Sequence, residues 1–157
     1  MEVLNTLAEV AVAFAGFSSV VIIFRRRSDG AWNDTDANRF MGMIVHALHA
    51  AGFAFVPQIL QYFLPGEAMV WAVSSLLLGI TTLLHVFVAG RLETATYRAS
   101  AGVVLLAGLA VFMLQMANLF SWLGPPGPGL FLIGVFWHTA QAGLLFFLLV
   151  TVRPQRA

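Results

Sequence analysis

The 157-residue chain contains no cysteine and no lysine. Without cysteine it has no disulfide, thiolate metal site, iron–sulfur cluster or cysteine nucleophile. All eight basic residues are arginines, and with seven acidic residues they give a net charge of +1. This balance excludes a basic nucleic-acid-binding protein and an acidic tail protein, so we expect no nucleic-acid partner.

Charge of either sign is also scarce. Only 10% of the residues are charged, whereas soluble domains have about 25%. The hydrophobic share is 60% and the mean hydropathy is +0.88. Such a chain has too few polar side chains to cover a soluble globule and is too apolar to be disordered. The sequence therefore predicts an integral membrane protein, with the lipid bilayer as its main partner.

Long apolar runs account for most of the chain. Crossing the hydrocarbon of a bilayer takes about 20 mostly apolar residues in a helix. Five runs satisfy this length: 3–24, 40–64, 68–90, 101–123 and 129–152. We therefore expect an all-α fold, a bundle of five transmembrane helices that forms a single domain over 1–157. No room remains for a soluble domain.

The arginines predict the orientation of the bundle. They fall in three segments that five crossings place on the same side of the membrane: Arg25, Arg26, Arg27 and Arg39; Arg91 and Arg98; Arg153 and Arg156. The loops of the opposite side carry no basic residue. Because positively charged loops stay in the cytoplasm, we expect the amino terminus outside and the carboxyl terminus inside.

Polar and small residues gather on one face of each expected span. Small side chains allow helices to approach, and amides and hydroxyls form hydrogen bonds between them. The first span carries Ala13 and Gly16 on such a face, and the fifth carries Gly134 and Ala142. The amides expected to pack helices together are Asn5, Gln58, Gln61, Gln115, Asn118 and Gln141.

Five ionisable residues lie inside the expected spans, where a charge is costly and usually functional. Measured from the span centres, Glu9 and His138 form an outer layer, and three histidines form an inner layer: His46, His49 and His85. A carboxyl group and imidazoles can pass protons along such a series. The first hypothesis is therefore a homo-oligomeric channel or transporter that provides a polar pathway for protons or small ions.

Two alternatives come from other classes. In the first, His46, His49 and His85 hold haem or a divalent metal, in an electron-transfer protein. No further metal ligand reinforces this set, so no cofactor remains the simpler expectation. In the second, the chain is a non-catalytic accessory or structural subunit whose polar faces dock a membrane partner. An enzyme is not expected, because the sequence has no nucleophile–base motif and no phosphate-binding loop.

Several short motifs also resemble a known group. They are Ala13-Phe14-Ala15-Gly16-Phe17-Ser18-Ser19, Arg25-Arg26-Arg27, Trp32, Asp36-x-x-Arg39, Gly127-Pro128-Gly129 and Gly134-x-x-Trp137. In these the chain is similar to small, uncharacterised, multi-span membrane proteins of bacteria. The resemblance implies the bacterial inner (plasma) membrane and no particular activity. The second helix of that group is mainly aliphatic, so His46 and His49 depart from its pattern.

Overall fold

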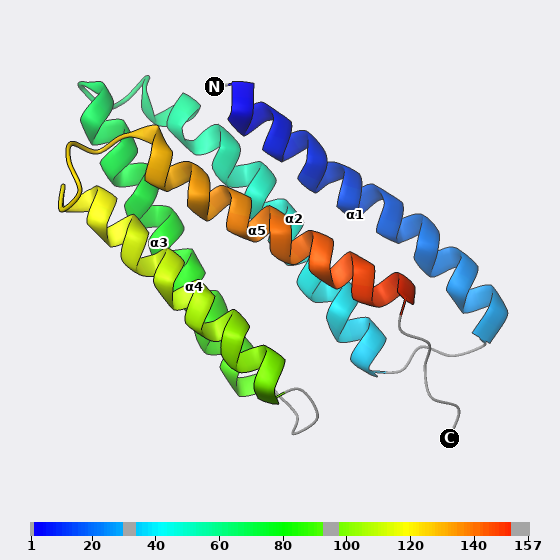
Figure 1. Ribbon diagram of the computed structural model, residues 1–157. Coiled ribbons are helices and arrows are strands. Elements are labelled where there is room, and N and C mark those ends of the chain that lie inside the picture. The colour runs from blue at the N-terminus through cyan, green and yellow to red at the C-terminus, as the bar shows by residue number, and fades with distance from the viewer. Residues whose placement is uncertain (1, 30–33, 93–97, 152–157) are drawn as a thin grey trace. The chain divides into compact units, whose positions relative to one another are not determined.

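The computed structural model describes residues 2–29, 34–92 and 98–151. The regular secondary structure in these ranges is entirely α-helical and consists of five helices (Figure 1): α1 (Glu2–Asp29), α2 (Asp34–Leu60), α3 (Glu67–Leu92), α4 (Arg98–Leu119) and α5 (Pro128–Thr151). Each of the five is long and apolar enough to cross a membrane. The predicted all-α fold, with five helices of membrane-spanning length and apolarity, is thus confirmed, while the orientation of the termini stays a prediction.

Two helices end earlier than the apolar runs do. The run 40–64 predicts a helix to Leu64, but α2 ends at Leu60, and Phe63 N–H donates to the carbonyl of Leu60 in a tight turn at 3.0 Å. The run 101–123 extends past Leu119, where α4 ends. Hydropathy alone therefore placed the ends of both helices too far along the chain.

A capping motif explains the end of α4. Ser121 has a positive φ of 59°, and Trp122 N–H donates to the carbonyl of Ala117 at 2.9 Å. This bond and the longer bond from Ser121 N–H to Asn118 satisfy carbonyls that the helix leaves free. The left-handed residue reverses the chain, so the apolar residues that follow lie in the turn.

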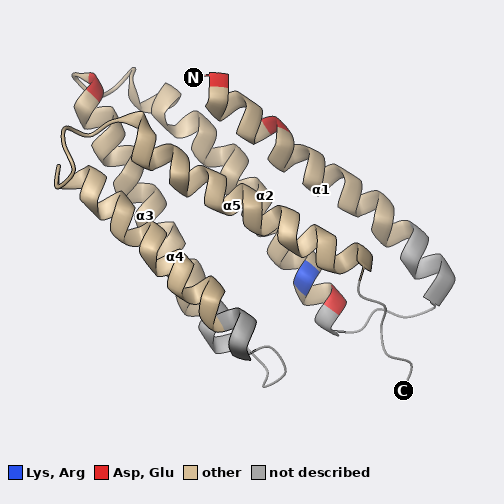
Figure 2. Cartoon of the chain, viewed as in Figure 1, with Lys and Arg blue, Asp and Glu red and all other residues tan. Residues whose placement is uncertain are grey.

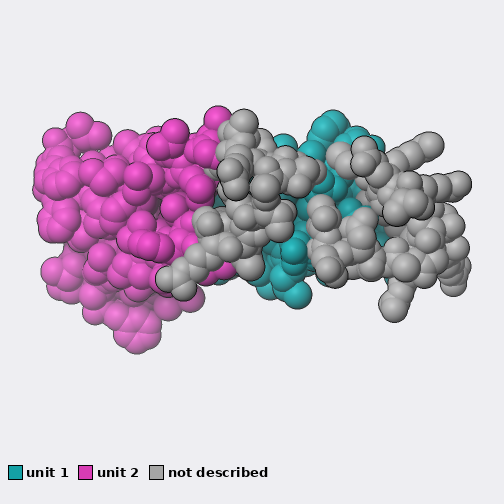
Figure 3. All heavy atoms as spheres, turned by 90° about the horizontal axis from the view of Figure 1, so that it is seen from below, with its two compact units in different colours: residues 1–55, 138–157 teal, residues 56–137 magenta. Residues whose placement is uncertain are grey.

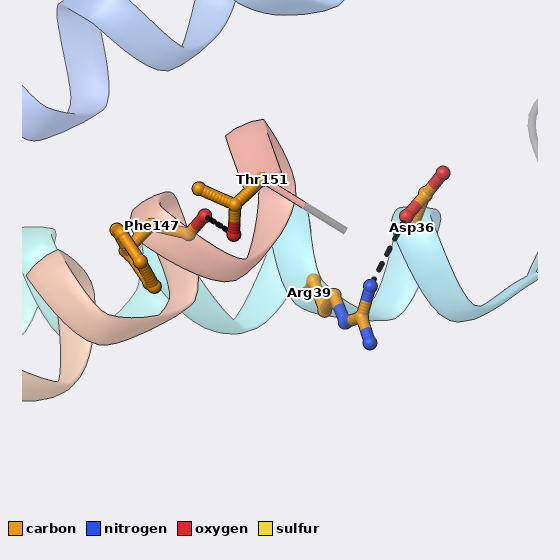
Figure 4. Close-up of polar contacts among 4 residues, drawn as sticks. All are labelled: Asp36, Arg39, Phe147 and Thr151. Atoms are coloured by element: carbon orange, nitrogen blue, oxygen red, sulfur yellow. Dashed lines mark hydrogen bonds and ion pairs between the residues drawn. The ribbon is translucent and has the colours of Figure 1, made fainter. Parts of the chain in front are cut away.

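Charged residues are placed at the start of α2. The helix begins at Asp34, and the acidic residues of its first turn interact favourably with the positive end of the helix dipole. Within its first turns Arg39 forms an ion pair with Asp36, with 3.5 Å between Nη1 and Oδ1 (Figure 4). Both side chains are largely buried. The other seven arginines and Trp32 lie outside the residues whose side chains are described.

Residues 1–55 and 138–157 belong to one compact unit, here unit 1, and residues 56–137 form unit 2 (Figure 3). Unit 1 contains α1, the first part of α2 and the second part of α5. Small residues bring its helices together. A Cβ atom added at Gly143 would lie 3.1 Å from the ring of Phe14, and one added at Gly42 would lie 3.2 Å from Leu145. Thus α5 packs against both α1 and α2 in this unit.

Unit 2 contains α3, α4, the end of α2 and the first part of α5. Helices α3 and α4 pack along each other. A Cβ added at Gly79 would lie 2.7 Å from Met116, so the glycine lets α4 approach α3. The ring of Trp71 packs on Phe131 of α5, with centroids 5.8 Å apart. Unit 2 is therefore a packed three-helix core. Whether the chain forms a single domain stays a prediction.

The surface agrees with a lipid environment. Large apolar side chains are exposed on every helix, among them Phe17, Leu48, Leu84, Leu106 and Phe136. The described charged residues lie at helix ends, apart from one acidic residue along α1 (Figure 2). Apolar residues cover the middle of the helices on the outside, as the hydrocarbon requires.

The turn between α2 and α3 provides a test of the backbone geometry. Gly66 has a φ of +82° and no atom within 4 Å of an added Cβ. Replacing Gly66 with Ala should therefore act through backbone strain alone and lower the free energy of unfolding by about 1 kcal/mol.

Gly52 of α2 is the matched control, because it is also open on its Cβ side but has no positive φ. Gly52→Ala should raise the free energy of unfolding by about 0.5–1 kcal/mol. Unfolding in detergent, followed by circular dichroism, measures both; a Gly66→Ala variant as stable as the wild type would contradict the prediction.

Candidate functional site

Three of the predicted site residues meet in unit 1. The ring nitrogens Nδ1 of His46 on α2 and Nδ1 of His138 on α5 lie 3.0 Å apart, within hydrogen-bond distance. The ring of His49, one turn further along α2, is stacked on the ring of His138 with centroids 5.6 Å apart. His138 is fully buried, and the other two are half-buried. We call these three residues the histidine cluster.

The spacing along the helices explains why they meet. His46 and His49 are three residues apart and share one side of α2. Both lie within two residues of the middle of the apolar segment Asp36–Leu60, and His138 lies equally near the middle of Pro128–Thr151. At 1.5 Å per residue, all three lie within about 3 Å of their span midpoints. The small residues Ala47, Ala50 and Ala54 of α2 are also buried, on the flank of the helix beside the two histidines.

Hydrogen bonding defines which ring atoms carry protons. A carbonyl oxygen only accepts, so His49 donates its Nδ1 proton to Val45 O, at 3.0 Å. Its Nε2 is then the acceptor nitrogen of the neutral ring. Between His46 and His138 one Nδ1 must donate and the other must accept. Neutral rings in this pair therefore exist as two different tautomers. The roles reverse when the Nδ1 proton crosses, the donor ring gains a proton at Nε2 and the acceptor ring loses its Nε2 proton.

The expected pair of Glu9 and His138 is not formed. His138 is buried and bonded to His46, whereas the Glu9 side chain is exposed on α1. No hydrogen bond or ion pair joins Glu9 to a residue that the structure describes. The reason is the direction of the helix face: Leu4, Ala8 and Ala11 of α1 turn into the protein, and at about 100° per residue Glu9 lies on the other side.

Glu9 belongs to a polar and small face that points outward. Asn5, Ala13 and Gly16 share this face, and all of them are exposed. No heavy atom lies within 4 Å of a Cβ built at Gly16. The corresponding faces of α4 and α5 turn inward instead, burying Gly108 and Gly134. Among the described residues of these three helices, the expected packing face therefore lies on the surface in α1 and in the interior in α4 and α5.

The fourth histidine belongs to unit 2. His85 on α3 donates its Nδ1 proton to the carbonyl of Thr81, at 2.7 Å. This bond leaves Nε2 as the acceptor nitrogen of its neutral ring. Among the described residues, no group of three or more His, Asp or Glu side chains is arranged to hold a metal ion. His46 and His49 belong to unit 1 and His85 to unit 2, so a haem or metal site formed by all three stays a prediction.

The amides divide into buried and surface groups. Gln115, Asn118 and Gln141 are buried, Gln58 is half-buried, and Gln61 and Asn5 are exposed. Asn118 has a role that the sequence did not reveal. It donates from Nδ2 to Ser75 Oγ at 2.8 Å and to the carbonyl of Gly127 at 3.0 Å, and its Oδ1 accepts from Gly127 N–H. One amide thereby fixes the turn at Gly127, which leads into α5, to the end of α4 and to α3.

Comparison with models of known protein families, with curated proteins and with solved structures finds no match. The chemistry of the site is therefore argued from its own residues. A partly buried, hydrogen-bonded pair of imidazoles, one of them stacked on a third, is suited to exchange of protons.

The tautomers of the histidines can be observed directly. We expect ¹⁵N spectra of histidine-labelled protein in bilayers, at a pH where the rings are neutral, to show Nδ1 protonation for His49 and His85. Of His46 and His138, one should be protonated at Nδ1 and the other at Nε2, because a single proton joins their Nδ1 atoms. Assignment comes from His→Gln variants, each of which removes one signal. Nε2 protonation of both His46 and His138 would contradict the bond.

Proposed function

We propose that the protein is a homo-oligomeric membrane protein that provides a pathway for protons, with His46 and His138 at its transfer step. The observation that carries the proposal is the 3.0 Å contact between their Nδ1 atoms on two apolar, membrane-length helices. An ionisable group at this depth is costly and most often functional. The pair favours protons over other small ions, because two imidazoles joined by a hydrogen bond expose no set of oxygen ligands.

The pair passes a proton in three steps. The ring whose Nδ1 donates binds a proton at its Nε2 and becomes an imidazolium. The shared Nδ1 proton then moves to the second ring, which now carries protons on both nitrogens. The second ring releases its Nε2 proton, so one proton has moved from one Nε2 to the other. The hydrogen bond has reversed its polarity and must reset before a proton can pass the same way again.

The remaining ionisable residues extend this proposal. The stacked ring of His49 presents its Nε2 as an acceptor beside His138, which supports a role in receiving or supplying the proton. His85 and Glu9 are proposed to continue the relay, His85 from unit 2 and Glu9 at an interface between copies. With the amino terminus outside, as the arginines predict, Glu9 lies toward the outer side of the bacterial inner membrane.

The outward polar face of α1 supports the homo-oligomer. A carboxyl group facing hydrocarbon is unfavourable, and small residues beside it are typical of a helix–helix contact. In a parallel pair of α1 helices about a two-fold axis, each residue meets its own copy. Glu9 then lies opposite Glu9, where a carboxylic acid both donates and accepts. The pair needs no cation, and none of the arginines lies at this level of the span.

Proton flux tests the relay. Purified protein in liposomes with an internal pH dye should acidify or alkalise the lumen when a potential is applied. His46→Gln and His138→Gln should each lower this flux by about 100-fold, the scale on which positioned proton-transfer groups act. Phe14→Leu, which changes packing between α1 and α5 in the same unit, is the matched control and should keep the flux.

The outcome separates the alternatives. Equal flux in the wild type and both histidine variants would refute the relay. A haem spectrum or one equivalent of metal in the purified protein would favour the electron-transfer alternative. Loss of a co-purifying partner on substitution, without any flux in the wild type, would favour the accessory subunit.

Single cysteines test the α1 interface, because the chain has none of its own. Gly16→Cys adds one thiol on the face of Glu9, and mild oxidation of membranes should link two copies through it. Leu106→Cys, on the exposed side of α4, is the control and should stay monomeric on a non-reducing gel. Glu9→Leu should change the yield of the Gly16→Cys dimer. Equal crosslinking at both sites would show that the linkage reflects random collision.

A further inference from the structure

Unit 2 buries two polar atoms that its described residues do not satisfy. They are the hydroxyl oxygen of Ser74 on α3 and the amide oxygen Oε1 of Gln115 on α4. Both residues are fully buried. In the interior of a membrane protein an unsatisfied polar atom costs several kcal/mol, because no bulk water reaches it. Two such atoms in one small unit therefore indicate a bound molecule.

Ser74 differs from six other described hydroxyls of the helices. Thr6, Ser18, Ser19, Thr81, Thr82 and Thr151 each donate to a carbonyl three or four residues earlier in their own helix. That bond is the usual way for a membrane helix to satisfy a hydroxyl. Ser74 does not use it, so its proton and its lone pairs are both available to another molecule.

The orientation of Gln115 is fixed. Its Nε2 donates to the carbonyl of Leu130 on α5 at 2.7 Å. Exchanging the two ends of the amide would place Oε1 against that carbonyl oxygen, where neither atom can donate. Gly134 provides the room for this contact, since a Cβ there would lie 2.8 Å from Nε2. Oε1 is therefore held as an acceptor that needs a donor from elsewhere.

The two atoms belong to the same junction of α3, α4 and α5. Leu78, one turn after Ser74, touches the position of Gly134 from α3, just as Gln115 does from α4. Trp71, about one turn before Ser74, packs on Phe131 of α5. Ser74 lies between these two contacts on α3. It therefore faces the segment of α5 that Gln115 also contacts.

We propose that a single water molecule is bound at this junction by Ser74 and Gln115. Water has two donors and two acceptor sites, and a buried water makes two to four hydrogen bonds. It donates one hydrogen bond to Gln115 Oε1 and forms a second one with the Ser74 hydroxyl, which can act as donor or acceptor. The Asn118 amide and Ser75, whose bond lies one turn further along α4, are already satisfied and do not compete. This site is independent of the histidine cluster and of any proton flux.

Magnetisation transfer from water tests the site in the wild-type protein. In bilayers with ¹⁵N-glutamine, rapid transfer should reach the Gln115 amide protons, and Ser74→Ala should weaken it. Ser18→Ala is the matched control, because Ser18 is also fully buried but bonds to Ala15 O at 2.7 Å; it should leave the Gln115 signal unchanged. Absence of transfer to Gln115 in the wild type would overturn the proposal.

A double-mutant cycle tests whether the two residues share one molecule. If they do, the double variant Ser74→Ala with Gln115→Met should lower the unfolding temperature by clearly less than the sum of the two single shifts. The reason is that either single substitution already removes the water molecule that both residues bind. Thr82→Ala with Gln115→Met is the control pair and should add. Additive shifts for Ser74 and Gln115 would overturn the shared site. An increase in unfolding temperature with sodium over choline, lost in Ser74→Ala, would identify a cation instead of water.

Discussion

Polar groups between the two membrane surfaces must find partners inside the protein, because hydrocarbon offers none. Backbone groups meet this requirement by forming helices, and most hydroxyls meet it by bonding to their own helix. The remaining polar side chains determine how the helices pack. Asn118 is the clearest example, since its one amide joins α4, α3 and the turn before α5. Removal of such a group would leave several buried partners unsatisfied.

The same constraint gives the histidine cluster its chemistry. His46 and His138 satisfy each other through one proton, and this arrangement works for either direction of the bond. A pair with two equivalent arrangements can change its protonation without breaking the packing around it. His49 and His85 are each oriented by a carbonyl of their own helix. The hydrogen bond between His46 and His138 thus serves both the packing of α2 on α5 and the proposed transfer of protons.

Close approach of helices depends on a few small residues. Gly134 lets the Gln115 amide reach the backbone of α5, and Gly143 lets Phe14 pack on the same helix. Opposite these contacts the helices expose apolar side chains. The face of α1 with Glu9 and Gly16 has the composition of a contact but lies on the surface. That mismatch is the physical basis for proposing a second copy there.

Much of the fold could be predicted from the sequence because hydropathy depends on composition over a whole helix. Five apolar runs predicted five helices, and the small and polar faces of α4 and α5 are indeed buried. The helix ends were less predictable. Apolar residues in the turns after Leu60 and Leu119 extended the runs, whereas local hydrogen bonds end the helices. The earlier end of α2, together with the start of its apolar segment at Asp36 instead of residue 40, also shifted the expected depths of His46 and His49, and so separated them from His138.

The sequence by itself determined the apolar character of the chain, the number of helices long enough to cross a membrane and the small set of ionisable residues inside them, since each depends only on the residues and their order along the chain. Only the tertiary structure decided which of those residues meet. The rotation of each helix about its axis turned Glu9 to the surface and His138 into the interior, and the neighbour of each helix paired His138 with His46. The rotation of a helix and the identity of its neighbours result from side-chain packing between residues far apart in the sequence. The periodicity along a single helix carries no information about that packing.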